Sequence, residues 1–273
     1  MHLRKEFITM IFPPLTWVLL LVAAAICAIG FYKFVYFMSV GYGLAVSGIG
    51  VAIFIIALLR GNLTPAMAVL CLLLLIYGVR LGGFLLVREI KSAAYRKTLN
   101  EQTGNPVPFP VKVVMWLLMA VLYVVQTSPV WYREATAPDG PLITAWIGAA
   151  IMAIGILLEA VADRQKSAAK LKAPNKPAMD GLYKISRCPN YFGEVTFWTG
   201  VFISGWGVLR GWQWLITALG YVMILMIMIS GAQRLEKRQN KNYGNLPEYQ
   251  AYVEKTPILV PFIPVYHLVK PEK

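Results

Sequence analysis

The sequence contains few histidines, cysteines and charged residues, and these shortages exclude several classes of protein. Its two histidines, His2 and His267, both lie near a terminus. This position excludes a bis-histidine haem, a histidine-rich metal centre and a histidine general base within the body of the chain. The three cysteines are scattered, with no Cys-x-x-Cys spacing, so we expect no disulfide framework and no metal site. Acid–base chemistry would have to come from tyrosine, lysine, aspartate or glutamate.

The balance of apolar and charged residues indicates a membrane protein. Hydrophobic residues occupy 58% of the 273 positions and charged residues only 14%, whereas about a quarter of a soluble domain is charged. Apolar runs of about 20 residues recur along the chain, and each is long enough to cross a hydrocarbon core of roughly 30 Å. The sequence lacks the alternating segments of about 10 residues that a β-barrel requires. It therefore predicts an all-α, polytopic membrane bundle.

We expect seven transmembrane helices in a single membrane domain that covers residues 1–273. The first apolar run is too long for the core of a signal peptide and lacks a clear cleavage site, so we interpret it as a membrane span. The predicted spans are Phe12–Phe31, Tyr36–Leu59, Ala66–Val87, Val111–Trp131, Leu142–Ala162, Tyr191–Leu209 and Trp212–Ser230.

The positive charge is concentrated in three of the segments between or after these spans. The net charge is +13, and lysines and arginines cluster in Arg88–Lys112, in Asp163–Asn190 and after Ser230. Basic segments of this kind stay on the cytoplasmic side and attract anionic lipid, so the charge indicates membrane contact and no nucleic-acid partner. With seven spans, this orientation predicts an external N-terminus and a cytosolic C-terminus.

The end of the fifth predicted span carries acidic and basic residues on one helical face. Glu159, Asp163, Lys166 and Lys170 follow one another at spacings of four, three and four residues. A solvated helix end with ion pairs explains the two lysines equally well. The two carboxylates have apolar neighbours, however, and a carboxylate at a membrane face is costly unless it is paired. We expect both to accept hydrogen bonds from a ligand.

The third predicted span presents Tyr77, Arg80, Phe84 and Arg88 on one face. Arg88 can extend to the interface, but Arg80 lies about two turns deeper, where a cation needs an anionic partner. That partner is either a carboxylate of the chain or a phosphate of a ligand. Tyr77, one turn further in, would place a phenol at the bottom of a pocket, although a tyrosine within a span often only packs.

The turn over residues 180–194 leads directly into the sixth predicted span. Asn190 and Glu194 lie one turn apart at the opening of this span. Pro189 suits a first helical turn, because its missing N–H is not needed there. The exposed backbone amides of such a turn favour an anion, and Arg187 precedes them. These residues predict a ligand site at the membrane face.

The C-terminal segment is basic and rich in tyrosine. Arg234, Arg238 and Lys241 recur at helical spacing, which is typical of a helix lying on anionic lipid. The tail that follows turns back through several prolines and would form a lid over a ligand equally well. No Gly-x-Gly-x-x-Gly fingerprint joins a strand to a helix, and no Walker A sequence is present. A dinucleotide site would therefore be built from helix ends.

Three motifs lie in the second half of the chain. They are Leu158-Glu-(x)3-Asp-(x)-Gln-Lys166, Asp180-Gly-Leu-Tyr-(x)3-Arg-(x)-Pro-Asn-Tyr-Phe-Gly-Glu194, and a tail pattern that runs from Leu235-Glu-Lys-Arg through Tyr243-Gly and Tyr249-(x)2-Tyr252 to Pro261-Phe-Ile-Pro264. These motifs resemble the steroid 5-alpha-reductase-like family, and in particular its bacterial branch, often described only as a domain of unknown function. The match covers about Tyr77 to Pro264, and the first two spans match only as hydrophobic segments. The resemblance divides the chain into variable N-terminal spans, residues 1–65, and a reductase-like core, residues 66–264.

The resemblance implies a reductase of a bacterial inner membrane that binds NADPH from the cytosol. By motif, Asp163, Asn190 and Glu194 would hold the nicotinamide and its ribose. Arg80, Lys166, Lys170 and Arg187 would lie near the phosphate or the adenosine of the cofactor. The cofactor-binding residues that the resemblance implies are Glu159, Asp163, Lys166, Lys170, Tyr183, Arg187, Asn190, Glu194, Arg234, Glu236, Tyr243, Tyr249 and Tyr252.

The same resemblance implies that Tyr77 and Arg80 are the catalytic residues. Tyr77 aligns with the tyrosine that polarises the substrate carbonyl, because the Tyr-(x)2-Arg spacing is kept. Steroid reductases of the family pair this tyrosine with a glutamate of the second span, whereas Tyr36–Leu59 contains no acid. The implied reaction is hydride transfer to a conjugated C=C bond of a lipophilic enone, steroid-like or other, by a monomer in contact with membrane lipids.

Two other functions stay open on the sequence. Integral membrane methyltransferases that bind S-adenosylmethionine have a similar turn, but they usually carry histidine where this chain has Cys188, and they lack the Asn-Tyr-Phe-Gly-Glu run. A transporter or assembly protein is the third alternative, and inverted repeats or helices broken at mid-membrane would favour it. Neither feature is visible in the sequence.

Overall fold

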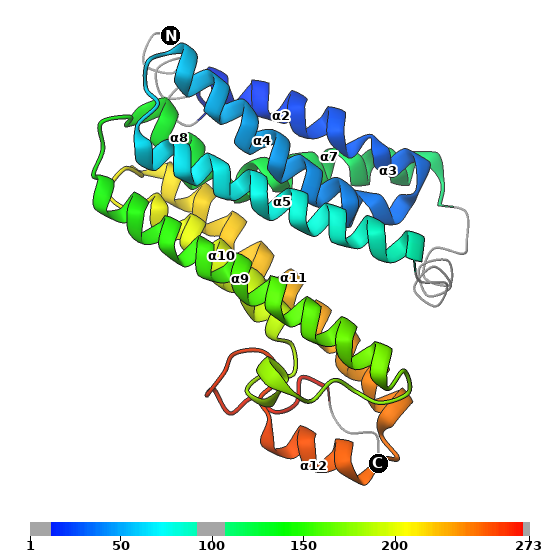
Figure 1. Ribbon diagram of the computed structural model, residues 1–273. Coiled ribbons are helices and arrows are strands. Elements are labelled where there is room, and N and C mark those ends of the chain that lie inside the picture. Colours follow the sequence, from blue (N-terminus) through cyan, green and yellow to red (C-terminus); the bar gives the residue numbers. More distant parts are fainter. Residues whose placement is uncertain (1–11, 92–106, 270–273) are drawn as a thin grey trace. The chain divides into compact units, whose positions relative to one another are not determined.

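The computed structural model describes residues 12–91 and 107–269, and within them every regular element is a helix (Figure 1). The middle of the basic segment Arg88–Lys112, residues 92–106, lies outside the described residues. Six of the described helices are long and apolar enough to cross a membrane. The chain is therefore an all-α, multi-pass membrane protein, as its composition predicts.

The chain divides into two compact units. The first comprises residues 1–149 and 201–220, and the second comprises residues 150–200 and 221–273. Three helices contribute residues to both units, and these are α9 (Leu142–Lys172), α10 (Pro189–Ser204) and α11 (Trp212–Tyr243).

The first unit contains most of the N-terminal helices. In it, α2 packs against α4 and α7, and α4 packs against α5. The elements are α2 (Pro14–Cys27), α3 (Ile29–Tyr32), η1 (Phe34–Met38), α4 (Val40–Leu59), α5 (Pro65–Lys91), α7 (Phe109–Gln126) and α8 (Ser128–Thr136).

The pair α4 and α5 is held in close contact by glycines. A Cβ atom added to Gly43 would lie 2.6 Å from the backbone oxygen of Gly78, and one added to Gly78 would lie 2.1 Å from the backbone oxygen of Gly43. No side chain fits at either position, so the two backbones touch, as is common where membrane helices pack. These helices correspond to the predicted spans Tyr36–Leu59 and Ala66–Val87.

The predicted span Val111–Trp131 is two helices in the structure. Helix α7 ends at Gln126, and the short helix α8 begins at Ser128. Pro129 lacks the N–H that a continuous helix would need, and it lies in the first turn of the new helix. The span therefore ends at Gln126, five residues earlier than predicted.

The second unit is built on the C-terminal parts of α9 and α11, with most of α10. It also contains η2 (Gly181–Lys184) and α12 (Pro247–Lys255). Helices α9 and α11 have 31 and 32 residues, which corresponds to about 46 and 48 Å at 1.5 Å per residue. This exceeds a hydrocarbon core of about 30 Å. Both helices are therefore long enough to extend beyond an apolar layer. Their C-terminal parts bond to η2, α12 and the tail, which lie beside them in Figure 1.

The sixth predicted span, Tyr191–Leu209, corresponds to the shorter helix α10. Its 16 residues span about 24 Å, and it is not among the six helices that are long enough to cross a membrane. The other six predicted spans correspond to those six helices. The predicted count of seven spans is therefore not confirmed.

Candidate functional site

The second unit contains a close crossing of α9 and α10 that places Glu159 against the first turns of α10. A Cβ atom added to Gly193 would lie 2.8 Å from the Cγ atom of Glu159, and one added to Gly155 would lie 2.4 Å from the backbone nitrogen of Phe197. Only glycine fits at these positions, so the helices approach closely. Gly193 directly precedes Glu194, and two of the predicted site residues thereby lie near one another.

All four predicted carboxylates are buried in this unit. Glu236 is 1% exposed, Glu159 is 2% exposed, Glu194 is 7% exposed and Asp163 is 9% exposed. Burying a carboxylate is unfavourable unless the oxygens accept hydrogen bonds or pair with a cation. These carboxylates come from the C-terminal half of α9, the first turns of α10 and the C-terminal part of α11.

Arg187 and Asn190 carry buried polar atoms that have no hydrogen-bond partner among the described residues. Arg187 is 1% exposed, and its Nε and Nη1 atoms have no such partner, nor has the Oδ1 atom of Asn190. An unsatisfied buried donor or acceptor costs about 1–3 kcal/mol. Such atoms at the opening of α10 are suited to receive a ligand.

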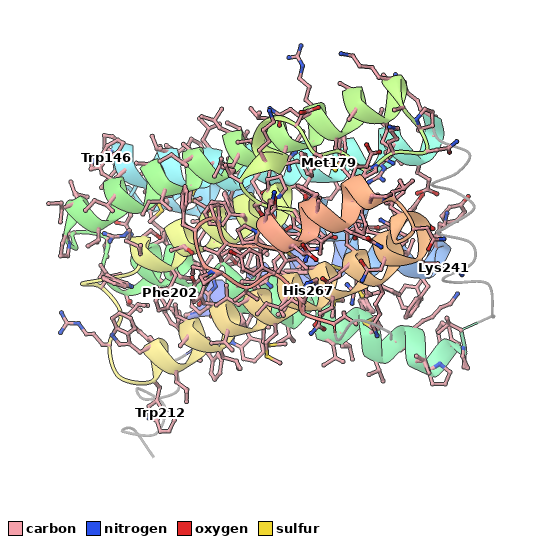
Figure 2. All side chains as sticks on the ribbon, turned by 90° about the horizontal axis from the view of Figure 1, so that it is seen from below. Trp146, Met179, Phe202, Trp212, Lys241 and His267 are labelled. Atoms are coloured by element: carbon pink, nitrogen blue, oxygen red, sulfur yellow. The ribbon has the colours of Figure 1, made fainter. Side chains whose placement is uncertain are left out.

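The remaining guanidinium nitrogen of Arg187 belongs to a cluster that we call the tail latch. Its Nη2 atom donates to Oε1 of Glu236 at 2.8 Å and to the backbone oxygen of Tyr266. Glu236 also lies 3.3 Å from Nδ1 of His267 and accepts hydrogen bonds from the backbone N–H groups of Leu268 and Val269 at 2.9 and 3.0 Å. Figure 2 shows the crowded side chains of this region, with His267 labelled. Glu236 thus holds the C-terminal tail onto α11.

Lys170 is occupied by groups of the chain itself. Its ammonium donates to the hydroxyl of Tyr243 at 2.6 Å and to the backbone oxygens of Lys176 and Pro174 at 2.6 and 3.1 Å. An ammonium has three N–H donors, so these contacts use all of them. In this arrangement Lys170 clamps the ends of α9 and α11 together.

The tyrosines of the predicted site also bind the chain. Tyr249 donates to Oδ1 of Asn240 at 2.7 Å, and Tyr252 donates to the backbone oxygen of Tyr183 at 2.6 Å. The Tyr183 hydroxyl in turn donates to the backbone oxygen of Ala162 at 3.4 Å. Burial raises the pKa of Tyr249 to about 12, and the charge of the nearby Arg187 opposes this shift. These tyrosines fix α12 and η2 onto the helix ends.

Two cations of the predicted site lie at its edge. Lys166 is half-buried and Arg234 is exposed. Burial raises the pKa of the Cys188 thiol to about 12, and the charges of Lys166 and Arg187 oppose this shift. Lys166 therefore lies within electrostatic range of the turn before α10. Among the described residues, no cluster of three or more metal-ligating side chains occurs.

The predicted catalytic residues Tyr77 and Arg80 belong to α5 of the first unit. Tyr77 is fully buried, and its hydroxyl lies 2.9 Å from the hydroxyl of Tyr42 on α4. The ring of Tyr42 lies 5.0 Å from that of Tyr123, whose hydroxyl donates to the backbone oxygen of Phe37 at 2.5 Å. Tyr42 was not among the predicted site residues, because the partner expected for Tyr77 in the second span was an acid, whereas the polar partner in the structure is the Tyr42 phenol.

A second polar feature of the first unit was also overlooked. Arg133 on α8 is buried, and it donates to the backbone oxygens of Ser204 and Pro141 at 2.7 and 3.0 Å. Its neighbour Glu134 is buried as well and pairs with Arg60 at 3.2 Å. The signal was an adjacent arginine and glutamate directly after the predicted span Val111–Trp131. These contacts satisfy both residues and indicate a structural role.

Comparison with known proteins identifies one family. Residues 36–256 match the model of a family described as "Protein of unknown function (DUF1295)". The match begins in the second predicted span and includes α9, α10, α11 and α12. No curated protein and no solved structure matches the chain.

Proposed function

The chain belongs to the DUF1295 family, and we propose that it is an NADPH-dependent membrane reductase that acts on a conjugated C=C bond of a lipophilic substrate. The observation that supports the proposal is the set of unpartnered buried polar atoms on Arg187 and Asn190, close to the crossing at Glu159. A ligand that carries phosphate, hydroxyl and amide groups would satisfy both kinds of atom. The proposal includes a monomer in a bacterial inner membrane. The external N-terminus and cytosolic C-terminus expected from seven spans belong to it only with α10 as a seventh span, because six spans place both termini on one side.

The residues of the second unit fit such a cofactor in part. The Nε and Nη1 groups of Arg187 are donors suited to a phosphate. The Oδ1 atom of Asn190 is an acceptor for the carboxamide of a nicotinamide or for a ribose hydroxyl, and Asp163 and Glu194 supply carboxylates for the remaining hydroxyls. Lys170 and the tail tyrosines are engaged with the chain, so we assign them to the scaffold of the site.

The chemistry requires that negative charge on the substrate oxygen be stabilised while the C=C bond is reduced. When bound, NADPH would supply the hydride for one carbon of that bond, and a proton from solvent would be added to the other. Tyr77 would donate a hydrogen bond to the substrate oxygen, where the charge develops. Tyr42, whose hydroxyl is 2.9 Å from that of Tyr77, would then donate to the Tyr77 oxygen and make the Tyr77 proton easier to give. In this proposal the two tyrosines have the role of the tyrosine and glutamate pair of steroid reductases.

The test compares two asparagines of the second unit. Asn190→Leu removes an acceptor that has no partner among the described residues, so folding stability should stay equal or rise while NADPH binds about tenfold more weakly. Asn240→Leu removes the acceptor of the buried Tyr249 hydroxyl, so it should cost about 1–3 kcal/mol of stability and leave the NADPH affinity of the folded fraction unchanged. Calorimetric titration and thermal unfolding of the purified protein give both quantities.

The same titration distinguishes the competing functions. Binding of NADPH by the wild-type protein and its loss in Asn190→Leu support the reductase. Binding of S-adenosylmethionine in place of NADPH would contradict it and favour a methyltransferase. If neither cofactor binds, or if Asn190→Leu binds NADPH as tightly as the wild type, the assignment of this site is wrong.

A further inference from the structure

The tail of the second unit forms a loop that is fixed at both ends. The backbone N–H of Arg187 donates to the oxygen of Pro257 at 2.9 Å, and the guanidinium of the same residue donates to the backbone oxygen of Tyr266. Between these points, the N–H of Ile258 donates to the oxygen of Val265 at 2.9 Å and closes the base of the loop. Both arms of the loop are therefore held to Arg187, which lies two residues before the start of α10.

The tip of this loop presents apolar side chains to the surroundings. Phe262 is 90% exposed and Ile263 is 50% exposed. Phe262 is also the only non-glycine residue of the described chain with a positive φ, at 66°, a conformation that side chains rarely adopt. Pro261 and Pro264 flank the pair and restrict it further. The fold thus holds an exposed aromatic ring in a fixed position.

The exposed residues of α9 and α11 locate the edge of the apolar layer in this unit. On α9 the exposed residues change from apolar at Val161 to charged at Arg164, and on α11 they change from Ile229 to Arg234. Exposed apolar side chains on membrane helices face lipid, and basic side chains lie at the headgroups. The layer therefore ends close to Asp163 on α9 and between Ile229 and Arg234 on α11.

The loop lies at this level. A Cβ atom added to Gly231 would lie 3.3 Å from the ring of Tyr191, so the first turn of α10 is level with the edge of the layer. Arg187, which holds the loop, lies in the bend two residues before the start of α10 at Pro189. Two residues span at most about 7 Å, and the headgroup region adds roughly 5–8 Å to each side of the hydrocarbon core. The base of the loop therefore lies among the headgroups.

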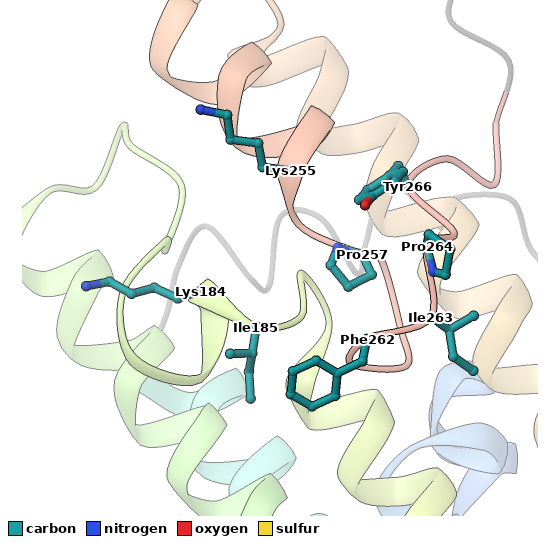
Figure 3. A pocket seen from close by; sticks show the side chains of 8 residues that line it. All are labelled: Lys184, Ile185, Lys255, Pro257, Phe262, Ile263, Pro264 and Tyr266. Carbon is teal, nitrogen blue, oxygen red and sulfur yellow. The ribbon is translucent and has the colours of Figure 1, made fainter.

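The loop borders a pocket of about 250 Å³ with a cationic part and an apolar part. Lys184 and Lys255 line it together with Ile185 and Phe262. Figure 3 shows Ile185 and Phe262 at the edge near the start of α10, and Lys255 at the far edge. The carboxylate of Asp180 lies 3.7 Å from the ammonium of Lys184, but both groups are largely exposed, so this pair is weak.

We propose that this pocket binds the headgroup of an anionic phospholipid, with Phe262 and Ile263 inserted between neighbouring lipids. The two ammonium groups complement a lipid phosphate, and the apolar wall continues towards the acyl chains. A soluble anion would leave the exposed ring and the apolar wall in water, so the combination favours a lipid. The tail is then an anchor on the membrane surface, independent of any cofactor that the helices bind.

The first test measures where the loop tip lies. The three native cysteines are buried, so a fluorophore attached to Phe262→Cys in the full-length protein labels one site, and unlabelled wild type checks this. In vesicles of phosphatidylcholine with phosphatidylglycerol, the probe should be quenched by lipids that carry a spin label near the headgroup. A probe on Asn175→Cys, an exposed position of the same unit, should instead be quenched by aqueous iodide. Equal quenching of both probes by iodide would overturn the insertion of the loop.

The second test measures the preference for anionic lipid. Binding of spin-labelled phosphatidylglycerol is compared with binding of spin-labelled phosphatidylcholine. The proteins are the wild type, the pocket variant Lys184→Ala/Lys255→Ala and a control variant, Lys172→Ala/Lys237→Ala. The two lysines of the control are also exposed in this unit. One lysine near an anionic surface contributes about fivefold in affinity, so the pocket variant should lose on the order of 25-fold at the specific site and the control much less. An equal preference in both double variants would overturn the headgroup site, as would full displacement of the lipid by inorganic phosphate.

Discussion

Replacing one partner of the buried ion pair in the tail latch should release the C-terminal tail. Arg187 and Glu236 are 1% and 0% exposed at their side chains and lie 2.8 Å apart. Removing one partner of such a pair leaves the other charge buried without compensation, which costs about 3–5 kcal/mol. The tail can avoid this cost by opening and admitting water. We therefore expect Glu236→Leu to raise the open fraction of the tail by a factor of about 10² to 5 × 10³.

The assay is hydrogen exchange of the backbone N–H of Ile258, which donates to the oxygen of Val265 within the tail and keeps this acceptor in the variant, combined with limited proteolysis of the tail. The matched control is Glu248→Leu. Glu248 forms an ion pair with Lys176 at 3.0 Å, but that pair is exposed, and exposed pairs contribute little. Exchange and cleavage of the control should resemble those of the wild type.

The double variant Arg187→Leu/Glu236→Leu separates the charge effect from the loss of packing. Because both charges are removed, it should be less disturbed than the sum of the two single variants. If Glu236→Leu keeps wild-type protection, or if the effects of the single variants simply add, the buried ion pair does not hold the tail and the reasoning fails.

Two further predictions concern groups that lie elsewhere. Tyr77→Phe should leave the NADPH affinity unchanged and lower the turnover of a conjugated enone by a factor of about 10² or more. Tyr42→Phe should lower the same turnover by about fivefold to tenfold, which corresponds to the loss of one hydrogen bond. Wild-type turnover in Tyr77→Phe would exclude the catalytic role of Tyr77. For Cys188, the pKa is raised from 9.0 to about 12 by burial, so the unfolded chain loses this proton first and the folded state loses stability progressively between about pH 9 and pH 12. Cys188→Ala should flatten the thermal unfolding profile over that range, and an unchanged profile would contradict the assignment.

The membrane class and most of the helices could be predicted from the sequence because the signals are local. An apolar run of about 20 residues needs a helix of that length wherever it lies in the chain. The alignment of Glu159 with Asp163 follows from helical spacing alone. Pro129 was also a local signal for the end of the fourth span. The prediction placed that end at Trp131 instead of Gln126, because apolar residues continue to Trp131.

The partners of the polar side chains were decided by the tertiary structure. Lys170 and Arg187 look equivalent in the sequence, as cations near a predicted anion site. In the structure the Lys170 ammonium donates hydrogen bonds to three groups of the chain. The Nε and Nη1 atoms of Arg187, in contrast, have no hydrogen-bond partner among the described residues. Likewise, Tyr42 became the partner of Tyr77 only through the glycine contacts of α4 and α5. A side chain reveals its chemical type in the sequence, but whether it meets a ligand or another part of the chain depends on segments that are remote in sequence and adjacent only after folding.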